Sequence, residues 1–186
     1  GYKLTEFKHI YNPKSVVEAM RRHKFSNYWT STETYEALKV YMDMDFEGLK
    51  GDIVRMLGGG CVRVNTRSFQ NDMRTFNTGD DVLTLLIHLG YLGYDSDTKE
   101  AFIPNKEIIE EFENAMSVGG WAEIMRVLKA SEKLLEDTLR CDEESVARGL
   151  DAAHMEAASI LAYNDENSLG CAIGLAYYSA RKDYRL

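Results

Sequence analysis

The stretch that decides the fold is DDVLTLLIHLGYLGYDSDTKEAFIPNKEII, residues 80–109 of a chain of 186. Its first part predicts a helix over 80–89, with Asp80 or Asp81 as the N-cap and Gly90 as the stop. A helix that is apolar on nearly all sides is buried, so this helix should lie in the core. The apolar positions are Leu83, Leu85, Leu86, Ile87 and Leu89.

The second part of this stretch predicts a β-hairpin. Two short apolar runs, 91–94 and 101–103, flank the polar turn residues 95–98, as strands flank a turn. Asn105 then predicts the N-cap of the next helix. Upstream, residues 61–69 alternate apolar and polar side chains, as a short strand does. Strand, buried helix, hairpin and helix in this order resemble a winged-helix plan, an order that other small α+β modules share.

The remainder of the chain is predicted to be helical. A helix from Phe46 to Leu57 is stopped by three glycines, Gly58–Gly60, and these are not followed by the Lys and Ser/Thr of a phosphate-binding Walker A loop. The predicted fold class is therefore mainly α with a small α+β winged-helix-like module. We expect helical regions over 1–60 and 119–186, on either side of the module at 61–118.

Three apolar stripes predict three helices within 119–186. The third stripe is expected to face the core, with Gly170 and Gly174 allowing a neighbouring element to approach closely. The first stripe is Trp121, Ile124, Met125, Leu128, Leu135 and Leu139, the second is Val146, Leu150, Ala153, Ala157, Ile160 and Leu161, and the third is Leu169, Ile173, Ala176 and Ala180.

The charge argues against a broad nucleic-acid interface. The formal net charge is −8, whereas such an interface needs clustered Lys and Arg to displace counterions. The helix after the hairpin carries Lys106 against the acidic residues Glu107, Glu110, Glu111 and Glu113. Phosphates would be repelled by it, so we expect protein contacts rather than nucleic acid as partners.

Hydropathy and cysteine usage indicate a cytoplasmic protein. No apolar run approaches the roughly 18 residues that a membrane-spanning helix needs, so no membrane partner is expected. Cys61, Cys141 and Cys171 are far apart and form no Cys-x-x-Cys pair. We therefore predict reduced and mostly buried thiols, with neither a disulfide framework nor a zinc cluster.

The acidic and histidine residues near the C-terminus leave two interpretations open. His154 and Glu156 are two positions apart on a predicted helix, so they do not share a face and do not form a metal site of the His-Glu-x-x-His kind. Glu166 lies in a polar segment, residues 163–167, and can stabilise the start of the next helix. It can equally place a carboxylate there for a divalent cation. No complete metal site and no nucleotide-binding residue is predicted.

Several long strings of the sequence resemble one family of bacterial proteins, in which a predicted AAA-type ATPase is joined to a C-terminal PD-(D/E)XK nuclease-like domain. The strings are GYKL, IYNPKSVVEAM, NYWTSTETYEAL, NDM, DDVLTLLIHLGYLGYD, FIPNKEI and HMEAASILAYNDENSLGCAIGLAYYSARKDY. Together they span essentially the whole chain. The resemblance implies that the chain lies between the ATPase core and the nuclease core.

The resemblance also implies that both catalytic sets lie outside this chain. The Walker motifs of the family would precede Gly1. The Asp and Glu-x-Lys that hold the catalytic metal would follow Leu186, which we expect to be a cut rather than a natural end. The parent protein would resemble an ATP-dependent nuclease using ATP and Mg²⁺, while no cofactor is expected in this fragment.

By resemblance, Glu166 corresponds to the acidic residue on the first nuclease helix, and it is the candidate catalytic residue of an incomplete site. The residues that match the surrounding motif are His154, Tyr163, Asn164 and Tyr177. The functional hypothesis is a linker or regulatory fragment that is not catalytic by itself. The alternative is a stand-alone winged-helix-like module for protein–protein interaction.

Overall fold

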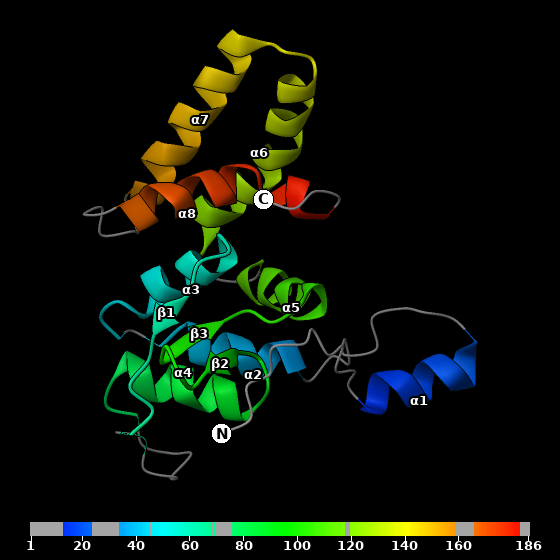
Figure 1. The fold of residues 1–186 in the computed structure, drawn as a ribbon, viewed down its shortest axis with the longest axis vertical. Helices are drawn as coiled ribbons and strands as arrows, with labels where there is room; N and C mark the ends of the chain where they lie inside the picture. The colour runs from blue at the N-terminus through cyan, green and yellow to red at the C-terminus, as the bar shows by residue number, and fades with distance from the viewer. Residues whose placement is uncertain are drawn as a thin grey trace.

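The structure is a computed structural model, and it describes residues 13–23, 34–44, 46–67, 69, 76–117, 120–158 and 166–182. Within these residues helices predominate, and one small antiparallel sheet accompanies them (Figure 1). The predicted fold class is thereby confirmed. The helices are α1 (Pro13–Arg22), α2 (Thr34–Met42), α3 (Leu49–Leu57), α4 (Gly79–His88), α5 (Lys106–Met116), α6 (Ala122–Leu139), α7 (Glu143–Ala158), α8 (Glu166–Ala176) and the 3-10 helix η1 (Tyr178–Lys182).

The sheet has the topology expected of a winged-helix-like module. Its strands are β1 (Val62–Arg63), β2 (Gly93–Asp95) and β3 (Glu100–Phe102), in the spatial order β1-β3-β2. Both strand pairs are antiparallel, and Ala101 of β3 lies opposite Val62 on one side and Tyr94 on the other. The predicted hairpin is confirmed. The predicted strand over 61–69 is shorter than expected, since among its described residues Val62 and Arg63 alone form the strand.

Helix α4 begins earlier than the sequence suggested, and its N-cap is Thr78 rather than Asp80 or Asp81. The Thr78 hydroxyl accepts a hydrogen bond from the Asp81 N–H at 3.3 Å. In return, the Asp81 carboxylate accepts from the N–H groups of Thr78, at 3.1 Å, and Asn77, at 2.9 Å. This capping box satisfies the free donors of the helix start from both sides. It also explains how Asp81 can be 4% exposed.

The core of the module is formed by α4 together with α2, α3 and α5. Leu83, Leu85 and Leu86 of α4 are at most 1% exposed, so the predicted burial is confirmed for the middle of the helix. Leu89 is 38% exposed, because the chain turns away at Gly90, whose φ is +85°. The predicted cap of α5 is confirmed by the Ile108 N–H, which donates to the Asn105 side chain at 3.0 Å.

The C-terminal helices form a second layer. Helices α6 and α7 form a helical hairpin, and α8 crosses between this hairpin and the module (Figure 1). The predicted third stripe is confirmed only in part, because Ala176 and Ala180 are buried whereas Leu169 and Ile173 of α8 are 47% and 46% exposed. The buried face is offset by one position, which places the smaller side chains against α3. That face is Ser168, Cys171, Ala172, Leu175 and Ala176.

The predicted division at residues 60/61 and 118/119 stays a prediction. Helices α2 and α3 of the first predicted region pack on α5, α4 and β1 of the module, and one hydrophobic cluster runs through all of them into α6 and α8. The described part of the chain contains no helix that is both long and apolar enough to cross a membrane.

Candidate functional site

The structure places three of the five candidate site residues. Glu166 is the first residue of α8, Tyr177 directly follows α8, and His154 is an exposed residue on α7. Tyr163, Asn164 and the side chain of Glu166 lie outside the described part of the chain. The catalytic role of Glu166 therefore stays a prediction.

Tyr177 ties the end of α8 to α6. Its hydroxyl lies 2.9 Å from the Thr138 hydroxyl, and the Thr138 hydroxyl donates its only proton to the Leu134 carbonyl at 2.8 Å. Tyr177 must therefore be the donor to Thr138. This contact gives Tyr177 a structural role that needs no metal or substrate.

The acidic residue two positions after His154 is also engaged in a structural contact. Glu156 of α7 forms an ion pair with Arg126 of α6 at 3.1 Å, and this pair raises the pKa of the Arg126 guanidinium. Among the described residues, no three His, Cys, Asp or Glu side chains are grouped as a metal ion would require. The described side chains of Glu156 and Tyr177 thus make individual contacts with α6.

The two layers approach closely at the α3–α8 joint, which we define as Gly58, Cys171 and Gly174 together with Arg55 and Ser168. A Cβ atom on Gly174 would lie 2.2 Å from the Gly58 carbonyl oxygen, and one on Gly58 would lie 2.6 Å from Cys171 Sγ. Both positions therefore require glycine. The expected close approach at Gly174 is confirmed, whereas a Cβ on Gly170 would meet nothing within 4 Å.

The joint sits on the C-terminal end of α3, where the three glycines stop the helix as predicted. Gly59 has a φ of +92°, and the N–H groups of Gly58, Gly59 and Gly60 each return to a carbonyl of α3 at 3.0 Å. Cys171 Sγ lies 3.6 Å from the carbonyl oxygens of both Val54 and Arg55. A thiol is a weak donor, so it adds a weak second contact to carbonyls that already accept from the N–H groups of Gly58 and Gly60.

The same layer is anchored a second time at the start of α6, where Trp121 is only 2% exposed. The Trp121 indole N–H donates to the Asp43 carboxylate at 3.3 Å. Lys50 of α3 lies 5.1 Å from the centre of the Trp121 ring and donates to the Gly120 carbonyl at 2.8 Å. A cation over an indole face adds to the burial of the ring. We call this second contact the Trp121 anchor.

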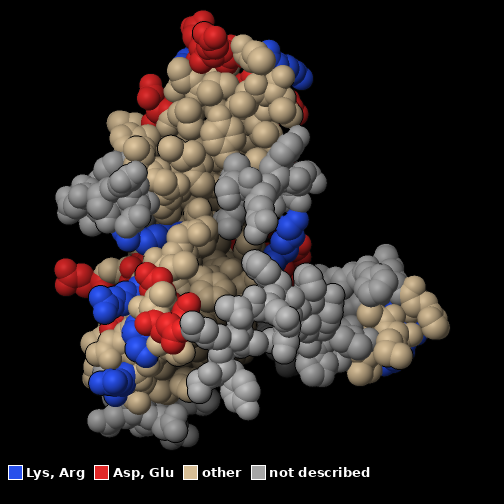
Figure 2. Space-filling view, viewed as in Figure 1, with Lys and Arg blue, Asp and Glu red and all other residues tan. Residues whose placement is uncertain are grey.

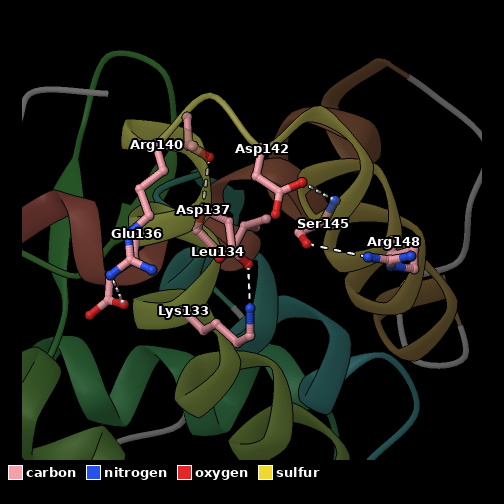
Figure 3. Close-up of polar contacts among 9 residues, drawn as sticks. Lys133, Leu134, Glu136, Asp137, Arg140, Asp142, Ser145 and Arg148 are labelled. Atoms are coloured by element: carbon pink, nitrogen blue, oxygen red, sulfur yellow. Dashed lines mark hydrogen bonds and ion pairs between the residues drawn. The ribbon is translucent and has the colours of Figure 1, made fainter.

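The C-terminal layer is braced internally. The buried Ser131 hydroxyl of α6 donates to the Leu128 carbonyl at 2.6 Å and accepts from the Ser179 N–H of η1 at 3.2 Å. At the tip of the α6–α7 hairpin, Asp142 accepts from the Ser145 N–H at 3.1 Å, and this hydrogen bond lowers the pKa of Asp142 (Figure 3). Lys133 pairs with Asp137 at 2.5 Å in the same view.

Two carboxyl groups, one on α3 and one on α5, are destabilised in their charged form. Burial raises the pKa of Asp52 on α3 to about 6, with Asp80 adding to this rise and Arg55 opposing it. Burial also raises the pKa of Glu111, with a contribution from Glu110. Glu111 is 1% exposed, so it belongs to the core rather than to the acidic surface on which the sequence had placed it.

Sequence reasoning missed most of these contacts. Trp121 stood out only as an apolar helix position, and its partner Asp43 is 78 positions away. The thiol prediction was partly wrong, since Cys171 is buried while Cys61 and Cys141 are exposed. Comparison of the chain with protein families, curated proteins and solved structures finds no match.

Proposed function

We propose that this chain is a connecting and regulatory region, which relays movement between an ATPase and a nuclease-like domain without catalysing a reaction itself. The resemblance of the sequence to the ATPase-nuclease family supplies the two domains that would be connected. The observation that carries the proposal is the α3–α8 joint, where backbone meets backbone at Gly58 and Gly174. A close-packed contact of this kind transmits a displacement, because it has no free volume in which to absorb it.

The Trp121 anchor supports the same proposal. The joint holds α8 on the end of α3, and the anchor holds the start of α6 on the ends of α2 and α3. Two separate contacts between the same layers resist rotation as well as translation. The ion pair of Arg126 with Glu156 and the bond between Ser131 and Ser179 extend this rigidity to α7 and η1.

The first experiment is an activity assay on the purified 186-residue chain. With ATP, Mg²⁺ and plasmid DNA, we expect neither ATP hydrolysis nor DNA cleavage above the background of a buffer control. Magnesium-dependent turnover that is lost in Glu166→Ala would contradict the proposal and make the chain an enzyme. Glu156→Ala is the matched control, since it also removes one carboxylate, near the C-terminal end of α7.

The second experiment reads the source gene outward from both ends of this segment. A Walker A motif upstream, with an Asp and a Glu-x-Lys within about a hundred codons downstream, is the expected result; that window is an ordinary domain size. An open reading frame that lacks both would remove the two domains that the relay needs.

The alternative function is a stand-alone module for protein–protein interaction. The observation that favours it is a cavity of about 450 Å³ between α6 and α7, lined by small and apolar side chains such as Val127, Ala130 and Leu134 and by charged ones that include Arg126 and Glu156. A helix of a partner could insert there. Sedimentation of the full chain discriminates the two functions. An adaptor stays monomeric, whereas a region severed from neighbouring domains self-associates through exposed apolar surface.

A further inference from the structure

A second hollow lies on the module, and it is lined by side chains of a different kind. Its volume is about 490 Å³, within the range of small-molecule pockets. Arg63 of β1, Arg67 after β1 and Lys99 of the hairpin turn line it together with Asp80 and Tyr94. Basic and acidic side chains are interspersed on the visible face of the module in Figure 2. Three cations line this one hollow in a chain whose net charge is −8. We call this hollow the β1-hairpin pocket.

Within the part of the chain that the structure describes, the two arginines of this pocket are not engaged elsewhere. Arg63 and Arg67 are exposed, and within the described residues neither guanidinium forms an ion pair or side-chain hydrogen bond. Lys99 Nζ donates to the carbonyl of Ser96, in its own turn, and forms no ion pair with another described residue. Each cation therefore has donors available to a ligand, and a guanidinium presents them in the fork that suits phosphate oxygens.

The backbone under the pocket is fixed before any ligand arrives. The Val64 N–H donates to the Lys99 carbonyl at 2.9 Å, which joins the end of β1 to the hairpin turn. The Asn65 N–H donates to the Asp80 carboxylate at 3.3 Å, and the Arg67 N–H donates to the Asn65 side chain at 3.3 Å. Fixing the chain in advance lowers the entropy lost on binding.

From this geometry we infer that the β1-hairpin pocket binds one phosphate group, either free phosphate or the phosphate of a small molecule such as a mononucleotide. Among the described lining residues three cations accompany one carboxylate, Asp80. The surplus of two positive charges matches the roughly −2 charge of a phosphate monoester at neutral pH. Asp95 and Glu100 lie on the neighbouring strands. An extended nucleic-acid backbone would have to run past them, whereas a single group would not.

This inference goes beyond the relay function, because the pocket shares no residue with the α3–α8 joint. Tyr94 lines the pocket beside the cations. Its ring offers a surface for stacking if the phosphate carries a base. A mononucleotide should then bind more tightly than inorganic phosphate, while equal affinities would identify free phosphate as the ligand.

The test is an amide NMR titration of the full chain at constant ionic strength, with inorganic phosphate, AMP and a 12-base-pair DNA duplex as separate ligands. Inorganic phosphate or AMP should shift the amide signals of Arg67 and Lys99 saturably. The double variant Arg63→Ala/Arg67→Ala should weaken binding roughly tenfold, since each exposed ion pair contributes about two- to fivefold. Arg140→Ala removes the same charge at the tip of the α6–α7 hairpin and should leave the affinity unchanged.

Two outcomes would overturn the inference. The first is the absence of saturable shifts in this pocket, or an equal response in the double variant. The second is a duplex affinity well above that of AMP that falls steeply with salt, which would indicate a nucleic-acid backbone track in place of a single-phosphate pocket.

Discussion

Replacing Gly174 by alanine tests the α3–α8 joint, and Gly170 on the same helix provides a matched control. Both substitutions add one methyl group to the interior of α8, and both therefore gain the same helix propensity, about 0.5–1 kcal/mol. They differ in what the methyl group meets. At Gly170 it enters open space, whereas at Gly174 it would lie 2.2 Å from the Gly58 carbonyl oxygen and 3.2 Å from the carbonyl carbon.

The contact at Gly174 determines how far Gly174→Ala lowers the free energy of unfolding. Its partner is backbone that is held in a helix stop, so it cannot move aside as the end of a flexible side chain could. Overpacking of this kind destabilises by about 1–3 kcal/mol, which exceeds the propensity gain. We expect Gly170→Ala to raise the free energy of unfolding by about 0.5–1 kcal/mol and Gly174→Ala to lower it by about 1–2 kcal/mol. For a chain of this length, the difference in stability between the two variants corresponds to roughly 5–10 °C in Tm.

Thermal unfolding followed by circular dichroism measures this difference directly. Hydrogen exchange locates it, because Gly174→Ala should reduce the protection of amides in α8 and at the C-terminal end of α3 while Gly170→Ala should not. Equal Tm values for the two variants, or a more stable Gly174→Ala, would refute the close packing of α8 on α3. The relay proposal would lose its main support with it.

Three further predictions concern other parts of the chain. Asp52→Asn should raise the free energy of unfolding at pH 7 by about 1 kcal/mol, a value discounted for partial exposure, and should have no such effect at pH 4. The pKa of Asp52 is raised to about 6 in the folded chain, so the folded state binds the extra proton and stability is lost as pH rises from about 4 to about 6. Urea unfolding at both pH values measures this effect, and an equal gain in stability at pH 4 would contradict it. Thr78→Ala should lower the free energy of unfolding by about 1 kcal/mol through loss of the capping box. The control Thr98→Ala, in the exposed hairpin turn, should change it by less than about 0.5 kcal/mol. Equal losses of the two variants in urea unfolding would reject the capping role. Tyr177→Phe should cost about 1 kcal/mol and should change no Mg²⁺ affinity in calorimetry; a loss of Mg²⁺ binding would return Tyr177 to the candidate site.

Local chemistry made much of the fold predictable from the sequence. The cap at Asn105, the hairpin and the stop at Gly58–Gly60 are decided within a few residues by turn and cap preferences. The cap of α4 was misassigned although its signal is local. Thr78 precedes Asp81 by three positions, which is the spacing of a capping box, and the acidic residue is the reciprocal partner rather than the cap.

The candidate site could be predicted less well, because its residues depend on a resemblance and on segments far apart in the chain. Glu166, Tyr163 and Asn164 stay predictions, and Tyr177 has a packing partner in Thr138 that no spacing indicates. The β1-hairpin pocket likewise draws Arg63, Arg67 and Lys99 from both sides of α4. Its cations are visible in the sequence, but their convergence is not.

By itself, then, the sequence indicated which segments form helices, turns and strands, because these preferences depend on neighbouring residues, although the start of α4 and the length of β1 differ from the prediction. Tertiary packing alone decided which face of α8 is buried. Two stripes offset by one position were available in that helix, and both have helical spacing. The side of α8 with Cys171 and Gly174 is buried because α8 lies backbone to backbone on Gly58. The larger side chains of Leu169 and Ile173 would prevent this contact.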